Sequence, residues 1–222
     1  MVETDLGEYI IQLRGDRPSH IIAPAIHLTR TDIAQLFETH FGLPNGVSSQ
    51  DFRRDVPLLI ETARKALRKV FLEAEVGVSG VNFGVAETGA LCLVTNEGNG
   101  RLISTAPRIH VAVMGMERLV PTLADLSVML QLLARSATGQ KLSVYSNFLC
   151  GPRRENESDG PEELHIVILD NGRSEILGTS LAEILYCIRC GACLNACPVF
   201  HSIGGHAYGS VYPGPVGSVL SP

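Results

Sequence analysis

Four cysteines near the C-terminal end of the chain constrain its structure more than any other feature. They stand at Cys187, Cys190, Cys193 and Cys197, in the pattern C-x2-C-x2-C-x3-C, and Pro198 follows directly. Three further cysteines at set offsets from a first arise by chance about once in 10^5 starting positions. Two-residue spacers let a short loop wrap soft thiolate ligands around one face of an iron–sulfur cube. The motif therefore predicts a [4Fe-4S] cluster bound by these cysteines.

Other uses of clustered cysteines fit this pattern less well. A structural zinc site usually combines two well-separated C-x2-4-C pairs, whereas these four thiols lie within eleven residues. A disulfide framework is typical of small secreted domains, and residues 1–10 lack the basic-then-apolar order of a signal peptide. The other two cysteines, Cys92 and Cys150, lie within or beside apolar runs. We expect both to be buried small hydrophobic residues.

The sequence leaves the identity of the fourth cluster ligand open. In bacterial two-cluster ferredoxins the fourth cysteine of each run ligates the other cluster. On that pattern Cys187, Cys190 and Cys193 would hold one cluster, and Cys197 would reach toward a second cluster whose other cysteines are absent from this chain. Either the chain is truncated before a second motif, or the cluster closes on Cys197 or on a non-cysteine ligand. We favour truncation.

Composition predicts a folded body and excludes two kinds of partner. Of the 222 residues 45% are hydrophobic and 18% are charged, as in globular proteins, and the net charge is -5. No basic run could neutralise a stretch of phosphates, so nucleic acid is excluded as a partner. The uncharged segment 194–222 contains several prolines and glycines, so we expect no transmembrane segment. We expect a cytoplasmic protein that reaches a membrane, if at all, through its partners.

Hydrophobic periodicity predicts alternating strands and helices. We predict strands at 19–24, 89–95, 101–104, 110–113, 141–148 and 164–170, and helices that start at 31–32, cover 55–73, start at Pro121 and cover 180–186. This order implies an α/β fold with three layers and a mostly parallel sheet. The change of character after Gly178 divides the chain into an α/β domain, 1–179, and a small iron–sulfur segment, 180–222, which we expect to be incomplete.

Outside the cysteines the candidate site residues are weaker. Glu87 stands at the start of a predicted strand and could act as a general acid or base, with a plain turn as the alternative. His206 follows the cysteines and could tune a cluster by hydrogen bonding. His27 and His110 flank apolar runs, where structural roles are more common. The loop 96–100 could approach a phosphate through its backbone, but a strand-connecting turn explains it more simply.

Six strings of residues are similar to one known family. They are 2–9 (VETDLGEY), 24–27 (PAIH), 82–89 (NFGVAETG), 187–200 (CIRCGACLNACPVF), 203–209 (IGGHAYG) and 212–215 (YPGP). Together they resemble the L-lactate utilization iron–sulfur protein family (the lactate utilization protein B family), whose members carry a LUD domain. The resemblance covers essentially the whole chain.

The resemblance implies a fold, a cofactor content and partners. It implies a LUD domain, similar to the sugar-isomerase and CoA-transferase-like fold, followed by a ferredoxin-type segment with two clusters. It also implies an electron-transfer subunit that works with two partner proteins in an L-lactate dehydrogenase-type oxidoreductase complex, which oxidises L-lactate to pyruvate and passes electrons to an unidentified acceptor. Family members have more sequence before the position of Met1 and a second cysteine motif beyond Pro222, so we expect this chain to be an internal fragment.

Two other hypotheses on function stay open. The α/β domain could itself be a catalytic or ligand-binding domain of isomerase- or CoA-transferase-like ancestry, with the cluster only bracing the C-terminal end. In the related fold superfamily, substrate-contacting loops lie where residues 87–89 stand. The glycine- and tyrosine-rich tail, 201–222, could also dock partner subunits, which is compatible with the electron-transfer hypothesis.

Overall fold

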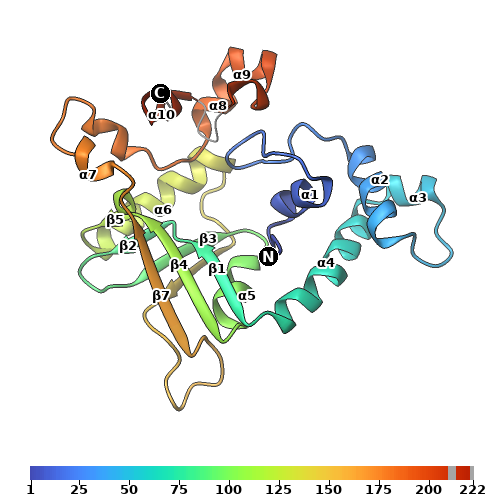
Figure 1. Cartoon of the computed structure of the whole chain (residues 1–222), viewed down its shortest axis with the longest axis horizontal. Helices are drawn as coiled ribbons and strands as arrows, with labels where there is room; N and C mark the ends of the chain where they lie inside the picture. The colour runs from blue at the N-terminus through green and yellow to red at the C-terminus, as the bar shows by residue number, and fades with distance from the viewer. Residues whose placement is uncertain (210–213, 221–222) are drawn as a thin grey trace. The chain divides into compact units, whose positions relative to one another are not determined.

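The computed structural model describes residues 1–209 and 214–220 (Figure 1). The chain forms two compact units, the first from Met1–Val70 and the segment that begins at Cys193, the second from Phe71–Ala192. We predicted a domain boundary at residues 179–180 from a change in sequence character. That division differs from the two compact units and stays a prediction. No helix in the described part of the chain is long and apolar enough to cross a membrane.

The second unit contains two β-sheets. The first sheet has the strand order β1 (Val76–Gly80), β4 (Ile109–Gly115) and β7 (Glu163–Leu169), and both of its pairings are parallel. Figure 1 shows β4 between β1 and β7. The second sheet has the order β5 (Leu119–Val120), β2 (Phe83–Val85), β3 (Leu91–Thr95) and β6 (Tyr145–Leu149), and of its pairings only β2 with β5 is parallel. The strands thus lie in two sheets instead of the single sheet that we predicted.

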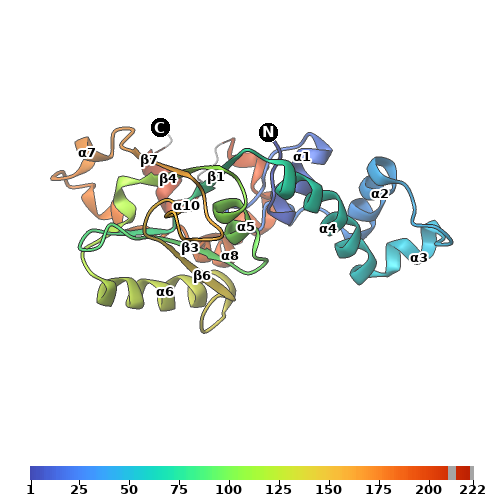
Figure 2. The same ribbon diagram turned by 90° about the horizontal axis from the view of Figure 1, so that it is seen from below.

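Strand β3 contributes to two apolar layers because neighbouring side chains of a strand point to opposite faces. Leu91 and Leu93 pack in one cluster with Ala112 and Met114 of the first sheet. Cys92 packs in a second cluster with Leu126 of α6 (Leu123–Thr138). Figure 2 shows α6 along the second sheet. The α/β class and the predominance of parallel pairing are confirmed, and the three layers are sheet, sheet and helix.

The first unit is helical before it reaches the cysteine segment. It contains α1 (Leu6–Arg14), α2 (Arg30–Phe41), α3 (Ser49–Arg54) and most of α4 (Val56–Glu73). The expected helices at 31–32 and 55–73 are α2 and α4. The buried residues of its core are Ile10, Ala34, Phe37, Phe52, Leu59 and Ala63. Leu59, Ala63 and Leu67 recur at four-residue steps on α4, which places them on one face of the helix.

The strand predicted at 101–104 is wrong, because these residues belong to the helix α5 (Asn99–Thr105). Gly98 precedes α5 with a φ of 84°, and the Thr105 hydroxyl donates to the Arg101 carbonyl four residues earlier. The loop 96–100 therefore leads into a helix and does not connect two strands. A short apolar run such as Leu102-Ile103 does not distinguish a strand from a buried helical turn.

The strand predicted at 19–24 is also wrong, because the segment forms turns. The His20 imidazole Nδ1 accepts hydrogen bonds from the backbone N–H groups of Ile22 and Ala23, each at 3.1 Å. The Ser19 N–H donates to the Pro24 carbonyl at 3.0 Å. These local bonds satisfy the backbone donors that a sheet would otherwise pair.

Several smaller boundaries differ from those that we predicted. Helix α6 begins after the N-cap Thr122, so Pro121 precedes the helix instead of opening it. Residues 180–186 contain a short 3₁₀-helix, Ala182–Tyr186. Pro198 opens a helix directly after the last cysteine of the motif. The remaining helices are α7 (Arg173–Ile176), α8 (Ala192–Ala196), α9 (Pro198–Ile203) and α10 (Gly214–Leu220), with two further 3₁₀-turns at Met116–Arg118 and His206–Tyr208.

We predict that Glu8 makes stability depend on pH. Burial, together with the hydrogen bond and negative charge of Asp5, raises the pKa of the Glu8 carboxyl to about 8. The unfolded carboxyl titrates near 4.5, so between these values the native state holds a proton that the unfolded state releases, and stability falls as pH rises. We expect Glu8→Gln to raise the Tm at pH 8 and to change it little at pH 5 in scanning calorimetry. The exposed Glu155→Gln serves as the control, and an equal change at both pH values in Glu8→Gln would contradict the prediction.

Candidate metal centre

The four cysteines of the motif lie on a loop and two short helices. Cys187 and Cys190 precede α8, Cys193 lies within it, and Cys197 is the N-cap of α9. The boundary between the two compact units falls after Ala192, so Cys187 and Cys190 belong to the second unit and the other two to the first. Cys193 is exposed, and the other three are partly exposed.

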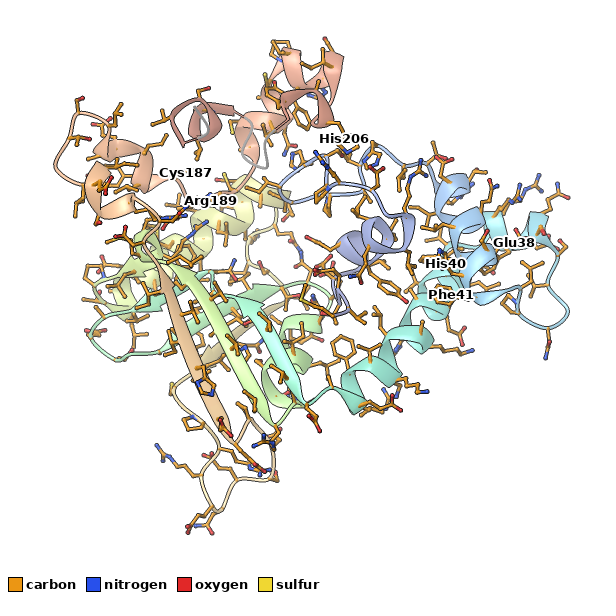
Figure 3. All side chains as sticks on the ribbon, viewed as in Figure 1. Glu38, His40, Phe41, Cys187, Arg189 and His206 are labelled. Carbon is orange, nitrogen blue, oxygen red and sulfur yellow. The ribbon has the colours of Figure 1, made fainter. Side chains whose placement is uncertain are left out.

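The loop between the first two cysteines is anchored within the second unit. Figure 3 labels Cys187 and Arg189 at this loop. The Arg118 guanidinium donates to the Ile188 carbonyl at 2.7 Å, and the Ile188 side chain packs against the apolar cluster beneath α6. Arg189 has a φ of 56°, the left-handed region that non-glycine residues adopt uncommonly. The Arg189 guanidinium donates to Glu117 Oε1 at 2.8 Å, which holds the loop in this conformation.

Glu117 is a buried carboxylate with two cationic partners. Its side chain is 4% exposed, and its Oε2 lies 2.7 Å from Nε of Arg173 while its Oε1 meets Arg189. Burial alone would raise the pKa of Glu117, but the hydrogen bond from Arg189 and the charges of both arginines outweigh burial and lower the pKa. The carboxylate therefore stays charged, and it ties the cysteine loop to the short helix α7.

The second half of the motif is anchored within the first unit by His20. Because His20 Nδ1 accepts two backbone N–H groups, its Nε2 carries the proton and donates to Asn195 Oδ1 at 3.1 Å. Burial lowers the pKa of His20, which favours the neutral ring that this pattern requires. The Phe200 ring of α9 meets the His20 ring edge-on, with centroids 5.4 Å apart. Asn195 lies between Cys193 and Cys197, so His20 fixes the turn of chain that carries them.

The residues after α9 continue this contact with the segment that follows α1. Gly205 is buried, and a Cβ atom at this position would overlap the Ser19 carbonyl oxygen. His206, labelled in Figure 3, donates from Nε2 to the Arg17 carbonyl at 2.7 Å, and its ring packs against His27. The described contacts of His206 are therefore with the N-terminal helical region, and a tuning role toward a cluster stays a prediction.

The surroundings of Cys197 favour its thiolate. A hydrogen bond from the backbone N–H of Phe200, with further bonds from the N–H of Val199 and the Tyr208 hydroxyl, lowers the pKa of the Cys197 thiol despite some desolvation. Burial first, and then the neighbouring Cys197 thiolate, raise the pKa of Tyr208. A thiolate is the form that binds metals, so Cys197 is prepared for ligation.

The structure gives the surroundings of the remaining cysteines and candidate residues. Cys92 is fully buried and its burial raises the pKa of the thiol to about 11, as expected for a small hydrophobic residue. Cys150 is exposed, so our expectation that it is buried is wrong. It directly follows the end of β6.

Glu87 lies in a turn and accepts a hydrogen bond from the Leu123 N–H at 2.7 Å, which satisfies a donor in the first turn of α6. His110 is buried and bonded to the Ser79 hydroxyl at 2.8 Å.

Sequence reasoning did not find the anchoring residues. Glu117 follows β4 and His20 lies in a segment that we predicted as a strand, and neither position carries a local pattern that marks it. The one available signal is Arg189, a cation between two expected metal ligands, because an arginine that the fold buries needs a compensating carboxylate.

The chain matches two known domain families. Residues 1–169 match the LUD domain, and residues 183–220 match the 4Fe-4S dicluster domain. The chain belongs to the LUD domain family. The second match includes the four motif cysteines and confirms the predicted [4Fe-4S] cofactor.

Curated relatives confirm the resemblance to lactate utilization iron–sulfur proteins. The whole chain is 54% identical to lactate utilization protein B of Bacillus cytotoxicus and 53% identical to the proteins of that name from Bacillus thuringiensis and Bacillus pumilus. It spans 45%, 45% and 46% of their respective lengths. A solved structure of a DUF162 family protein from Deinococcus radiodurans covers 72% of this chain and 92% of its own, at 16% identity, and its TM-score of 0.36 is too low for the two folds to be compared.

We predict that Glu117→Gln destabilises the second unit and loosens the cysteine loop. The substitution leaves the largely buried Arg173 and Arg189 without a countercharge, which costs about 3–5 kcal/mol when one partner of a buried pair is removed. We expect this loss in urea denaturation, together with less iron bound per chain. Glu162→Gln, at an exposed ion pair with Arg153, is the matched control and should cost less than about 1 kcal/mol. Equal effects of the two variants would contradict the assigned role of Glu117.

We predict that Gly205→Ala destabilises the first unit through a steric clash alone. Gly205 has a φ of -71° and a ψ of -32°, which alanine adopts readily, so the only obstacle is the overlap with the Ser19 carbonyl. Overpacking of this kind costs about 1–3 kcal/mol, measured by thermal or urea unfolding. Gly80→Ala, whose Cβ would meet nothing within 4 Å, is the control and should leave stability nearly unchanged. Wild-type stability in Gly205→Ala would show that the segment after α9 does not pack on Ser19 in solution.

Proposed function

We propose that this chain is the iron–sulfur electron-transfer component of a complex that oxidises L-lactate to pyruvate. The observation that carries the proposal is the C-x2-C-x2-C-x3-C motif within a region that matches the 4Fe-4S dicluster domain. The substrate class follows from the name of the relatives, lactate utilization protein B, to which the whole chain is 53–54% identical. Because the chain spans less than half the length of these relatives, the activity and partners of the complete protein are part of the proposal.

We assign Cys187, Cys190 and Cys193 as ligands of one cluster, and Cys197 as its fourth ligand or as a ligand of a second cluster. The sequence spacing supports this assignment, since a bacterial ferredoxin run has the same spacing and the same following proline. The local chemistry fits as well, because all four donors are soft and N–H bonds lower the pKa of Cys197. A bound [4Fe-4S] cluster accepts and releases one electron at a time.

The residues around the motif support electron transfer in two ways. They hold the ligand loop in one conformation, and they compensate the charge of Arg189. Gly191 has a φ of 73°, which lets the chain turn sharply after Cys190 without a side-chain clash. The backbone amides of Gly191 and Ala192 are the donors that we expect to set the reduction potential. Arg189 lies between two ligands, and its charge is compensated by Glu117. This arrangement keeps the ligand loop rigid during a change of one electron.

The alternative function, catalysis by the α/β domain, receives no support from its candidate residue. The contact of Glu87 with the first turn of α6 explains its position, and the residue is exposed. A glutamine at this position retains the accepting oxygen. We therefore expect Glu87→Gln to keep both stability and lactate-dependent activity, whereas loss of turnover with intact iron content would favour the catalytic hypothesis.

Partner proteins and an electron acceptor belong to the proposal too. An electron-transfer component needs a donor that abstracts the lactate hydrogens and an acceptor that removes the electrons. The tail that we predicted as a docking segment, 201–222, includes residues 210–213 and 221–222, which lie outside the described residues. We expect deletion of 201–222 to abolish co-purification with the partners if the tail docks them.

We predict that the double variant Cys187→Ser/Cys190→Ser loses the cluster. Protein purified without oxygen should contain about four iron and four acid-labile sulfide per wild-type chain, with an absorption that bleaches on reduction, and the double variant should contain neither. Cys150→Ser removes an exposed cysteine outside the motif and is the matched control, expected to keep the wild-type iron content.

The same variants test the physiological role when they are placed in the complete gene. We expect the double variant to abolish growth on L-lactate and the control to support it. Normal growth of the double variant without a cluster would refute the electron-transfer role. Zinc in place of iron in the wild-type protein would refute the cofactor assignment in this chain.

A further inference from the structure

Three metal-ligating side chains converge in the first unit, apart from the cysteine motif. Asp16, His27 and His206 each offer one ligand atom, and the three atoms lie within 4.8 Å of one another. Asp16 and His27 belong to the segment between α1 and α2, and His206 follows α9. None of these three residues is among the cysteines assigned as cluster ligands.

Contacts with two oxygens orient the His27 ring and place its Nε2 beside a carboxylate. The buried Ser19 hydroxyl lies 2.8 Å from His27 Nδ1 and 3.2 Å from the Pro24 carbonyl. On the other side of the ring, His27 Nε2 lies 3.1 Å from Asp16 Oδ2. At this distance either a proton on Nε2 or a bound cation lies between the nitrogen and the carboxylate oxygen.

A hydrogen bond to a backbone carbonyl also orients the His206 ring. Its Nε2–H donates to the Arg17 carbonyl at 2.7 Å, which leaves Nδ1 as the nitrogen that His206 can offer to a ligand. Its ring lies edge-to-face on His27, with centroids 4.6 Å apart. Each histidine therefore binds an oxygen through one ring nitrogen and presents the other, the arrangement that orients histidines in metal sites.

The third residue supplies the negative charge that a divalent cation requires. The Arg17 N–H donates to Asp16 Oδ1 at 2.8 Å, which orients the carboxylate and leaves Oδ2 toward His27. Nε of Arg14 also lies 3.4 Å from Oδ2, but this side chain is 43% exposed and can turn into solvent when a cation binds. The separation of 3.1 Å between His27 Nε2 and Asp16 Oδ2 is within the range of about 3.0–3.6 Å expected for two ligands each about 2.0–2.2 Å from zinc.

We propose that Asp16, His27 and His206 form a binding site for a divalent transition metal ion of the zinc class, with water in the remaining position. Two imidazoles and one carboxylate are borderline and hard donors, which suit Zn²⁺ and differ from the all-thiolate set of the cysteine motif. The ion joins the segment after α1 to the residues that follow α9. It thereby stabilises the part of the first unit that carries Cys193 and Cys197, whether or not the electron-transfer proposal holds.

Zinc binding to the cluster-loaded chain tests the proposal, because the cysteines are then occupied by iron. We expect equilibrium dialysis with elemental analysis to find one zinc ion per wild-type chain. His206→Gln and Asp16→Asn should each weaken zinc binding at least tenfold. His40→Gln, on α2 and labelled in Figure 3, is the matched control and should bind zinc as the wild type does. No zinc uptake by the wild type, or wild-type affinity in both site variants, would overturn the proposal.

A measurement on the wild type keeps the test decisive if the variants fold poorly. X-ray absorption at the zinc edge should show nitrogen and oxygen ligands at about 2.0–2.2 Å with imidazole scattering, and no sulfur at about 2.3 Å. Zinc should also raise the Tm of the wild type and of His40→Gln. A sulfur shell would place the zinc at cysteines and refute the site, and an unchanged Tm would refute its stabilising role.

Discussion

The ion pairs of the buried Glu117 carboxylate hold the first part of the cysteine motif, the loop between Cys187 and Cys190, in place. Moving a carboxylate and two guanidinium groups out of water costs several kcal/mol for each ion, and this cost is offset only when the charges meet in good geometry. Glu117 meets Arg173 at 2.7 Å and Arg189 at 2.8 Å, one partner for each carboxylate oxygen. Arg189 makes this ion pair from a left-handed backbone conformation, with a φ of 56°, in the loop between Cys187 and Cys190.

The second half of the motif depends on neutral hydrogen bonds instead of ion pairs. The tautomer of His20 is set by the two N–H groups that it accepts, so its contact with Asn195 has a defined donor and acceptor. Such a contact does not weaken with salt as an exposed ion pair does. The described anchors of each half of the motif lie in the compact unit to which that half belongs.

The sequence predicted the elements that have a strong local signal. The helix α4 was predictable because its apolar residues recur at three- and four-residue steps over eighteen residues. The conformations of segments 19–24 and 101–104 could not be predicted. Each segment is a short apolar run whose conformation is set by side-chain hydrogen bonds and packing. The separation of the strands into two sheets also had no local signal. It depends on β3, which pairs with β2 and β6 and not with β1 or β4.

The sequence by itself determined the cofactor class and the family, since four thiolates at fixed spacing are a local pattern that survives in any fold. The tertiary structure alone decided which residues hold the motif. Glu117 and Arg189 are 72 residues apart, His20 and Asn195 are 175 apart, and Arg17 and His206 are 189 apart. Hydrogen bonds and ion pairs act only over a few ångströms, so contacts of this kind exist only after the chain has brought distant segments together, and no local pattern can encode them.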